Sequence, residues 1–325
     1  MKKIIAALLC VCVAWVLTCF FGCAQAEGVT CYVPDGAPAL AVAKIMSEGH
    51  VGSVPTEVVV TTGEETSAKC VSGEADLAIL PTNAAVKICS TRNDYCIFSV
   101  NVYGLLYVVG NVQVESLQQL KGSVVYSIGL GNTPEFVFKK VLDSQNVAYE
   151  NDSNDAEKVN FKYETDGATI IPLVLQGKAN FAVLGEPAVS NLIAKAALQN
   201  KTVYRLFDLQ QLWKAAVQSD VAGYPQASLV VKKSLLKGSF AKELKNAVFA
   251  NAEFLNANLE NLNTLMQQHG SSLDVNYTAE IISRCNLVAV LAQDAKQDIE
   301  KYLQTFSGMN NLLPVKSSVY YEQND

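Results

Sequence analysis

Short apolar runs alternate with turn residues and with helix-like segments along most of this chain. Two of these runs, at residues 77–80 and 181–184, are bounded by turn residues and contain only apolar side chains. Runs of this length and composition are typical of parallel strands that are buried on both faces of a sheet. Because such strands alternate with helix-like segments here, the pattern predicts an α/β fold.

The same motif occurs twice. One copy runs from Gly73 to Ala84 and the other from Gly177 to Ala188. Each copy reads Gly-x-Ala-(Asp/Asn), then an apolar strand, a turn and an Ala-rich helix start. Thr62-Gly63 and Asp166-Gly167 precede the two copies by the same distance. The repeat predicts two similar α/β lobes, although any α/β chain aligns loosely with itself.

Two further turns extend the repeat upstream. Gly36-Ala37-Pro38 follows the expected strand at 30–33, and Gly131-Asn132-Thr133-Pro134 follows the one at 123–128. Proline suits the first turn of a helix, where its missing N–H group costs nothing. We therefore expect a helix to begin at each of these turns.

The expected crossings between the lobes are apolar strands. Phe98 to Val109 is long enough to pass from one sheet to another and contains Gly104, and Ala227 to Val231 is the expected return. We therefore predict two α/β lobes joined by two crossover strands, with a ligand cleft between them. Lobe 1 is expected to comprise residues 27–102 and 225–325 and lobe 2 residues 103–224. From Lys237 onward the apolar positions have helical spacing, which predicts C-terminal helices on lobe 1.

Residues 1–26 are predicted to be a signal peptide. Lys2 and Lys3 precede an apolar stretch over 4–21, which is near the lower limit for a membrane span. Gly22-Cys23 resembles a bacterial lipobox, which implies lipidation of Cys23. Cleavage after Ala26, or a retained membrane anchor, is the alternative. Each of the three places the folded part outside the cytoplasm.

Charge and cysteine content narrow the classes of function. The net charge is −6 and no basic run occurs, which argues against a nucleic-acid partner. Of the nine cysteines, Cys89 and Cys96 are the best disulfide candidates, with buried or reduced thiols as the alternative. No cysteine spacing suggests zinc, and we expect neither a metal site nor a cofactor.

Catalytic signatures are missing from the sequence. The only histidines are His50 and His269, and both lie near glycines at expected helix ends. No Ser-His-Asp or Cys-His arrangement, HExxH or P-loop motif is visible. The chain is therefore expected not to be an enzyme.

The candidate binding residues lie in polar turns that follow strands. Such turns lead into helix N-termini, where N–H groups and the helix dipole bind ligand oxygens. Thr82 and Asn83 are also expected to cap a helix, and Asn132 and Thr133 to stand at an exposed helix start. Each turn residue has a plain capping role as its alternative. The candidates are Asp35, Gly36, Ala37, Thr62, Gly63, Thr82, Asn83, Gly131, Asn132, Thr133, Asp166 and Glu186, with Tyr103, Tyr224 and Phe136 as aromatic residues that stack on the ligand.

Over residues 28–300, these turns and the repeated motif resemble bacterial ABC-transporter solute-binding proteins with the two-lobed periplasmic fold. The branch that serves nitrate, alkanesulfonates, taurine and thiamine-pyrimidine precursors is the most similar. The resemblance implies capture of a small solute, hinge closure and delivery to a membrane permease with its ATPase. It also implies a monomer outside the cytoplasm, tethered to the membrane through its lipid anchor or periplasmic.

The turns carry acids where an anion-binding member of that branch is expected to have basic or polar groups. Asp35, Asp166 and Glu186 stand there, and no Arg or Lys does. Buried carboxylates beside an anionic ligand are costly unless they are paired. The sequence therefore slightly favours a donor-bearing heterocycle, similar to a thiamine pyrimidine, over a sulfonate, nitrate or taurine. An enzyme on the same fold and a sensory binding domain are the alternative functions.

Overall fold

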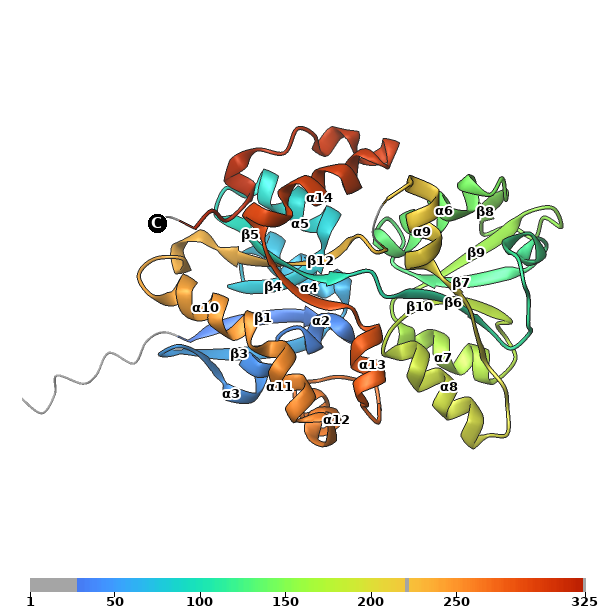
Figure 1. Ribbon diagram of the computed structural model, residues 1–325, viewed down its shortest axis with the longest axis horizontal. Coiled ribbons are helices and arrows are strands. Elements are labelled where there is room, and N and C mark those ends of the chain that lie inside the picture. Colours follow the sequence, from blue (N-terminus) through green and yellow to red (C-terminus); the bar gives the residue numbers. More distant parts are fainter. Residues whose placement is uncertain (1–27, 220–221, 324–325) are drawn as a thin grey trace, which may run out of the picture.

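The computed structural model describes residues 28–219 and 222–323. The expected signal peptide and Cys23 lie outside these residues. The chain forms two α/β lobes, each built on one mixed sheet, as the sequence pattern predicts (Figure 1).

The first sheet has the strand order β13-β5-β12-β4-β1-β3-β2. Strands β1, β3 and β4 are parallel to one another, while β12, β5 and β13 run antiparallel to their neighbours. β4 is buried from Leu77 to Leu80, which explains its continuous apolar run. The strands are β1 (Val29–Pro34), β2 (His50–Val51), β3 (Val54–Thr61), β4 (Leu77–Pro81), β5 (Tyr95–Tyr103), β12 (Pro225–Lys232) and β13 (Leu287–Leu291).

The second sheet has the order β11-β6-β10-β7-β9-β8. Its central strands β10, β7 and β9 are parallel, and β6 pairs antiparallel with both β10 and β11. The two copies of the repeated motif therefore form equivalent strands, β4 and β10, one in each sheet. The strands are β6 (Leu106–Gly110), β7 (Val124–Ile128), β8 (Tyr149–Asn151), β9 (Val159–Glu164), β10 (Phe181–Gly185) and β11 (Tyr204–Asp208).

Helices follow the parallel strands and cover both sheets, and the C-terminal helices α10, α11 and α12 pack on α3 (Figure 1). Short 3-10 turns occupy 117–120, 233–235, 307–312 and 317–319. The helices are α2 (Ala37–Leu40), α3 (Ala43–Glu48), α4 (Gly63–Ser72), α5 (Thr82–Thr91), α6 (Thr133–Ser144), α7 (Gly167–Leu175), α8 (Ala188–Leu198), α9 (Leu209–Val217), α10 (Phe240–Phe249), α11 (Asn251–Ala257), α12 (Leu259–Gln268), α13 (Ala279–Arg284) and α14 (Ala292–Gln304).

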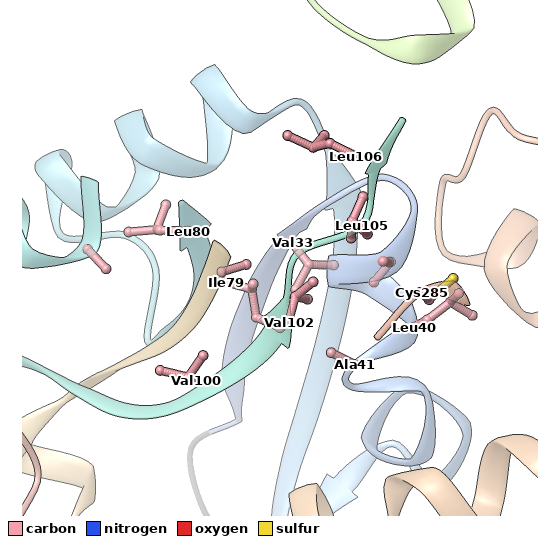
Figure 2. Close-up of a cluster of buried hydrophobic side chains, with 14 of the residues drawn as sticks. Val33, Leu40, Ala41, Ile79, Leu80, Val100, Val102, Leu105, Leu106 and Cys285 are labelled. Atoms are coloured by element: carbon pink, nitrogen blue, oxygen red, sulfur yellow. The ribbon is translucent and has the colours of Figure 1, made fainter. Parts of the chain in front are cut away.

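The apolar core of lobe 1 continues through the first crossing. Figure 2 shows side chains of β1, β4 and β5 packed with Leu105 and Leu106, which lead the chain into lobe 2. Leu105 is 5% exposed and Leu106 is fully buried. The crossing is therefore anchored by the same hydrophobic burial that holds the lobe together.

Three expectations need correction. The helix expected to begin at the Gly36-Ala37-Pro38 turn is two short helices, α2 and α3, because the chain breaks at Ala41 and Val42. The segment after Lys237 is not entirely helical as expected, because Leu287 begins strand β13, which pairs with the edge of β5. A short apolar run is compatible with either a strand or a buried helix. Here the run forms a strand because it pairs with the otherwise unpaired edge of β5. Cys89 and Cys96 are buried free thiols rather than a disulfide.

Two glycines allow the crossing strands to approach each other. Gly104 lies between β5 and β6 with φ +70°, and Gly223 precedes β12 with φ +98°. A Cβ atom on Gly223 would lie 2.7 Å from the backbone oxygen of Tyr103. Because backbone cannot move aside as a side chain end can, this position requires glycine.

We predict that Gly223→Ala lowers the free energy of unfolding by about 3 kcal/mol or more, from left-handed strain plus overpacking. The matched control is Gly177→Ala, since Gly177 also has a positive φ but no atom within 4 Å of the added Cβ. The control should lose only about 1–2 kcal/mol in urea unfolding. Equal losses in the two variants would contradict the steric account of the crossing.

Candidate functional site

The two sheets present the carboxyl ends of their parallel strands to each other (Figure 1). The turns at these edges meet at two points. A Cβ built on Gly36 would lie 3.6 Å from Cδ of Pro187, and Asn83 Nδ2 donates to the carbonyl oxygen of Gly131 across the lobes, at 3.4 Å. We call this region, formed by the turns before α2, α5, α6, α7 and α8, the facing edge. Open α/β folds bind ligands at such an edge.

Asp35 fastens a loop of its own lobe. Its carboxylate accepts hydrogen bonds from the backbone N–H of Gly36 (2.8 Å), from Ser271 Oγ (2.6 Å) and from both the N–H and Oγ of Ser272 (2.8 and 2.9 Å). The carboxylate joins the end of β1 to the loop after α12. With these four donors in place, Asp35 acts as a structural anchor.

Glu186 is buried and paired. Its side chain is fully buried, Oε1 lies 2.5 Å from Arg205 Nη2, and Oε2 accepts from the N–H of Ser190 in the first turn of α8 (3.0 Å). Arg205 comes from β11 and also lies over the ring of Tyr107. Arg205 is absent from the sequence-based candidates. The available sequence signal was an acid directly after a buried apolar strand, because a carboxylate that becomes buried there needs a charged partner.

Glu135 is a further acid at the facing edge, and it is absent from the sequence-based candidates. Its Oε2 accepts from the N–H of Gly131 (2.6 Å), and its Oε1 accepts from Lys139 Nζ and from Tyr163 Oη (3.0 Å). Burial opposes ionisation, but the hydrogen bonds from Lys139 and Gly131 prevail and lower the pKa of Glu135. A carboxylate of the chain itself thus occupies the N-terminus of α6.

Some of the remaining turn residues cap the N-terminus of a helix, and others do not. Thr62 and Asp166 cap α4 and α7 through Glu65 N and Thr169 N. Thr82 does not cap α5 as expected, because its hydroxyl is buried against Ser228 Oγ at 2.9 Å. Asn83 does not cap α5 either, because its amide reaches across to lobe 2. Of the other candidates, Ala37 is buried, Gly63 is half-buried and begins α4, and Asn132 donates to Leu130 O within its own turn.

The aromatic candidates lie against other protein groups. Tyr224 is 2% exposed and stacks on Tyr302 of α14, while Tyr103 donates to Asp298 of the same helix (2.8 Å). Tyr302 in turn donates to Thr133 Oγ1 at 2.9 Å, so Thr133 is buried rather than exposed. Burial raises the pKa of Tyr302, which keeps its hydroxyl protonated as the donor.

Tyr224 and Tyr302 belong to a group of five packed aromatic rings, which we call the inter-lobe aromatic cluster. Two members come from helices α6 and α9, one directly precedes β12, and two lie in α14 or shortly after it. The cluster therefore joins lobe 2 to the C-terminal segment. Ring centroids lie 5.2–6.0 Å apart, within the range of favourable aromatic pairs. The cluster comprises Phe136, Trp213, Tyr224, Tyr302 and Phe306.

Other features of the described chain lie outside the facing edge. A cavity of about 320 Å³ is lined by the end of α7 and the segment before β11, and one of about 240 Å³ lies between α3, α11 and α12. Within residues 28–219 and 222–323, no group of three or more His, Cys, Asp or Glu is placed to hold a metal ion. No helix in those ranges is long and apolar enough to cross a membrane.

Known proteins resemble this chain in structure rather than in sequence. No family model and no curated protein matches it. An ABC transporter protein from Parabacteroides distasonis is similar with a TM-score of 0.72 and 20% identity, over 91% of this chain and 99% of that one. The aliphatic sulphonate binding protein SsuA from Escherichia coli is similar with a TM-score of 0.61 and 14% identity, over 92% and 93%.

A third similar structure is the ligand-binding component of an ABC-type import system from Staphylococcus aureus, with zinc bound. Its TM-score is 0.58 at 11% identity, over 86% of this chain and 91% of that one. At these identities the likeness establishes a two-lobed periplasmic-binding-protein fold for this chain. A sulphonate-binding and a zinc-bound protein share that fold, so the fold leaves the ligand open.

We predict that Arg205→Leu lowers the free energy of unfolding by about 2–3 kcal/mol, because it leaves the Glu186 carboxylate buried without its cation. Arg284→Leu is the matched control, since the Glu280 partner of Arg284 is 71% exposed and such pairs contribute about 1 kcal/mol or less. Urea unfolding at neutral pH measures both. Similar small losses would show that Glu186 is not buried as described.

We predict that Tyr302→Phe and Thr133→Val each cost about 1 kcal/mol, because each removes one buried hydrogen bond that joins the lobes. The double variant should cost clearly less than the two single losses added together, since both remove the same bond. Unfolding free energies of the four proteins complete the cycle. Strict additivity would mean that the hydroxyl groups do not interact.

Proposed function

We propose that the chain is an extracytoplasmic solute-binding protein of an ABC importer. The observation that carries this proposal is the meeting of two sets of strand-end turns across two lobes, with Asn83 and Gly131 in contact between them. The two-lobed fold that the chain shares with ABC import proteins supports the same role. The solute binds at the facing edge and is delivered to the membrane permease and its ATPase.

The proposed working cycle is opening and closing of the lobes. Residues 27–102 with 225–325 move as one unit and 103–224 as the other, and the two crossing segments act as the hinge. Gly104 and Gly223 support this, because both lie at the crossings and glycine adopts a wider range of backbone angles than other residues. The contacts at the facing edge then belong to the closed form, and a solute enters when they separate.

The proposed solute is a small polar organic molecule, and a donor-bearing heterocycle is preferred over a sulfonate, nitrate or taurine. The acids that motivated this preference have structural partners, which removes them as direct ligand contacts. Asp35 and Asp166, which form no ion pair, still place negative charge at this edge, and that charge disfavours an anion. The protein is proposed to act as a monomer, held at the membrane by a lipid on Cys23.

We expect native mass spectrometry of the protein purified from its own cells to detect one bound small molecule per chain. Release and identification of that molecule, chemically unaltered after long incubation, is the predicted result. Conversion of the molecule during incubation would contradict the binding role and favour an enzyme. Fatty-acid modification of Cys23 is read from the same spectra.

A further inference from the structure

At four of the five turns of the facing edge, an acid of the chain accepts a hydrogen bond from a backbone N–H group. Asp35 accepts from the N–H that precedes α2, Glu135 from the turn before α6, and Asp166 and Glu186 from the first turns of α7 and α8. Each carboxylate takes a position in which an anionic ligand would otherwise bind. Each of these four turns therefore carries a carboxylate that is bonded to the backbone, and for α7 and α8 the bonded N–H group belongs to the first turn of the helix.

Helix α5 is the exception. It is ten residues long, it has no acid in its first turn, and no side chain caps it. The first N–H groups of any helix lack intrahelical partners and remain available as donors. Because no acid and no side-chain cap stands at this end of α5, its first N–H groups are available to a group from outside the chain.

Asn83 adds an acceptor beside these donors. It is 9% exposed, and its Nδ2 is directed at the carbonyl oxygen of Gly131, which fixes the orientation of the amide. Its Oδ1 is buried and has no hydrogen-bond donor among the described residues. Buried polar atoms nearly always have a hydrogen-bond partner, so we expect a donor from outside the chain to bond to this oxygen.

The charged side chains of the facing edge disfavour an anionic ligand. Lys139 and Arg205 are each paired with a carboxylate of the facing edge. Asp35 and Asp166 form no ion pair with any described basic residue. An anion would meet this negative excess, whereas a cation would meet the positive end of α5.

We propose that Asn83 and the N-terminus of α5 form a subsite for an uncharged ligand that presents an N–H donor next to an acceptor, as a carboxamide, lactam or aminopyrimidine does. The ligand donates to Asn83 Oδ1 and accepts from the first N–H groups of α5. This inference rests on the proposed function, because it assumes that the solute binds between the lobes.

The test is calorimetric titration of the full chain, stripped of solute, with five probes. Nicotinamide and cytosine carry the uncharged donor–acceptor edge, ethanesulfonate and nitrate are anions, and benzamidine is a cation. We expect at least one of the first two to bind and the other three not to. Asn83→Ala should weaken that binding about tenfold, the effect of one lost hydrogen bond.

Asn111→Ala is the matched control. Its Oδ1 is also buried without a partner, but it lines the cavity at the end of α7, away from the facing edge. The control should bind the probe as the unchanged protein does. Circular dichroism of both variants separates lost binding from lost folding.

Three results would overturn the subsite. The first is binding of an anion or of benzamidine in preference to nicotinamide and cytosine. The second is no binding of either uncharged probe at about 50 mM, a concentration at which even millimolar affinity gives clear occupancy. The third is equal weakening of binding by Asn83→Ala and Asn111→Ala. An anionic solute found bound to the protein from its own cells would also overturn it while leaving the proposed function intact. Failure of the proposed function itself would appear as chemical turnover of the bound molecule.

Discussion

The structure depends on satisfying the backbone N–H groups of the turns that lead from the sheets into the helices of the facing edge. Two sheets that face each other through their carboxyl edges bring these turns together, and each buried N–H group needs an acceptor. Asp35, Glu135, Asp166 and Glu186 supply acceptors from within the chain. The same carboxylates influence which charges the edge between the lobes tolerates.

Burial at the crossings and in the inter-lobe aromatic cluster complements these polar contacts. Leu105 and Leu106 continue the core of lobe 1 toward lobe 2, and Tyr302 joins α14 to α6. The contacts between the lobes therefore include a hydrophobic part that does not depend on a ligand. In the proposed cycle, a solute at the facing edge adds to this closure and contributes only the difference in free energy between the open and closed forms.

The repeated motif was sufficient to predict two α/β lobes, because buried parallel strands leave continuous apolar runs such as Leu77 to Leu80. It was not sufficient for the roles of individual turn residues. Asp35 and Glu186 were selected from their places in the turns, but their partners Ser271, Ser272 and Arg205 come from distant segments that no local pattern connects to them. The strand β13 was not predicted for the same reason, because it forms by pairing with the edge of β5, which is distant in the sequence.

Hydrogen–deuterium exchange of the protein, with its own solute bound and after the solute is removed, tests solute binding between the lobes most directly. The account predicts that the solute slows exchange on both sides of the facing edge, at residues 82–85 of lobe 1 and 129–135 of lobe 2. Protection confined to one lobe, or found at the cavity lined by Gly177 and Lys201, would contradict it.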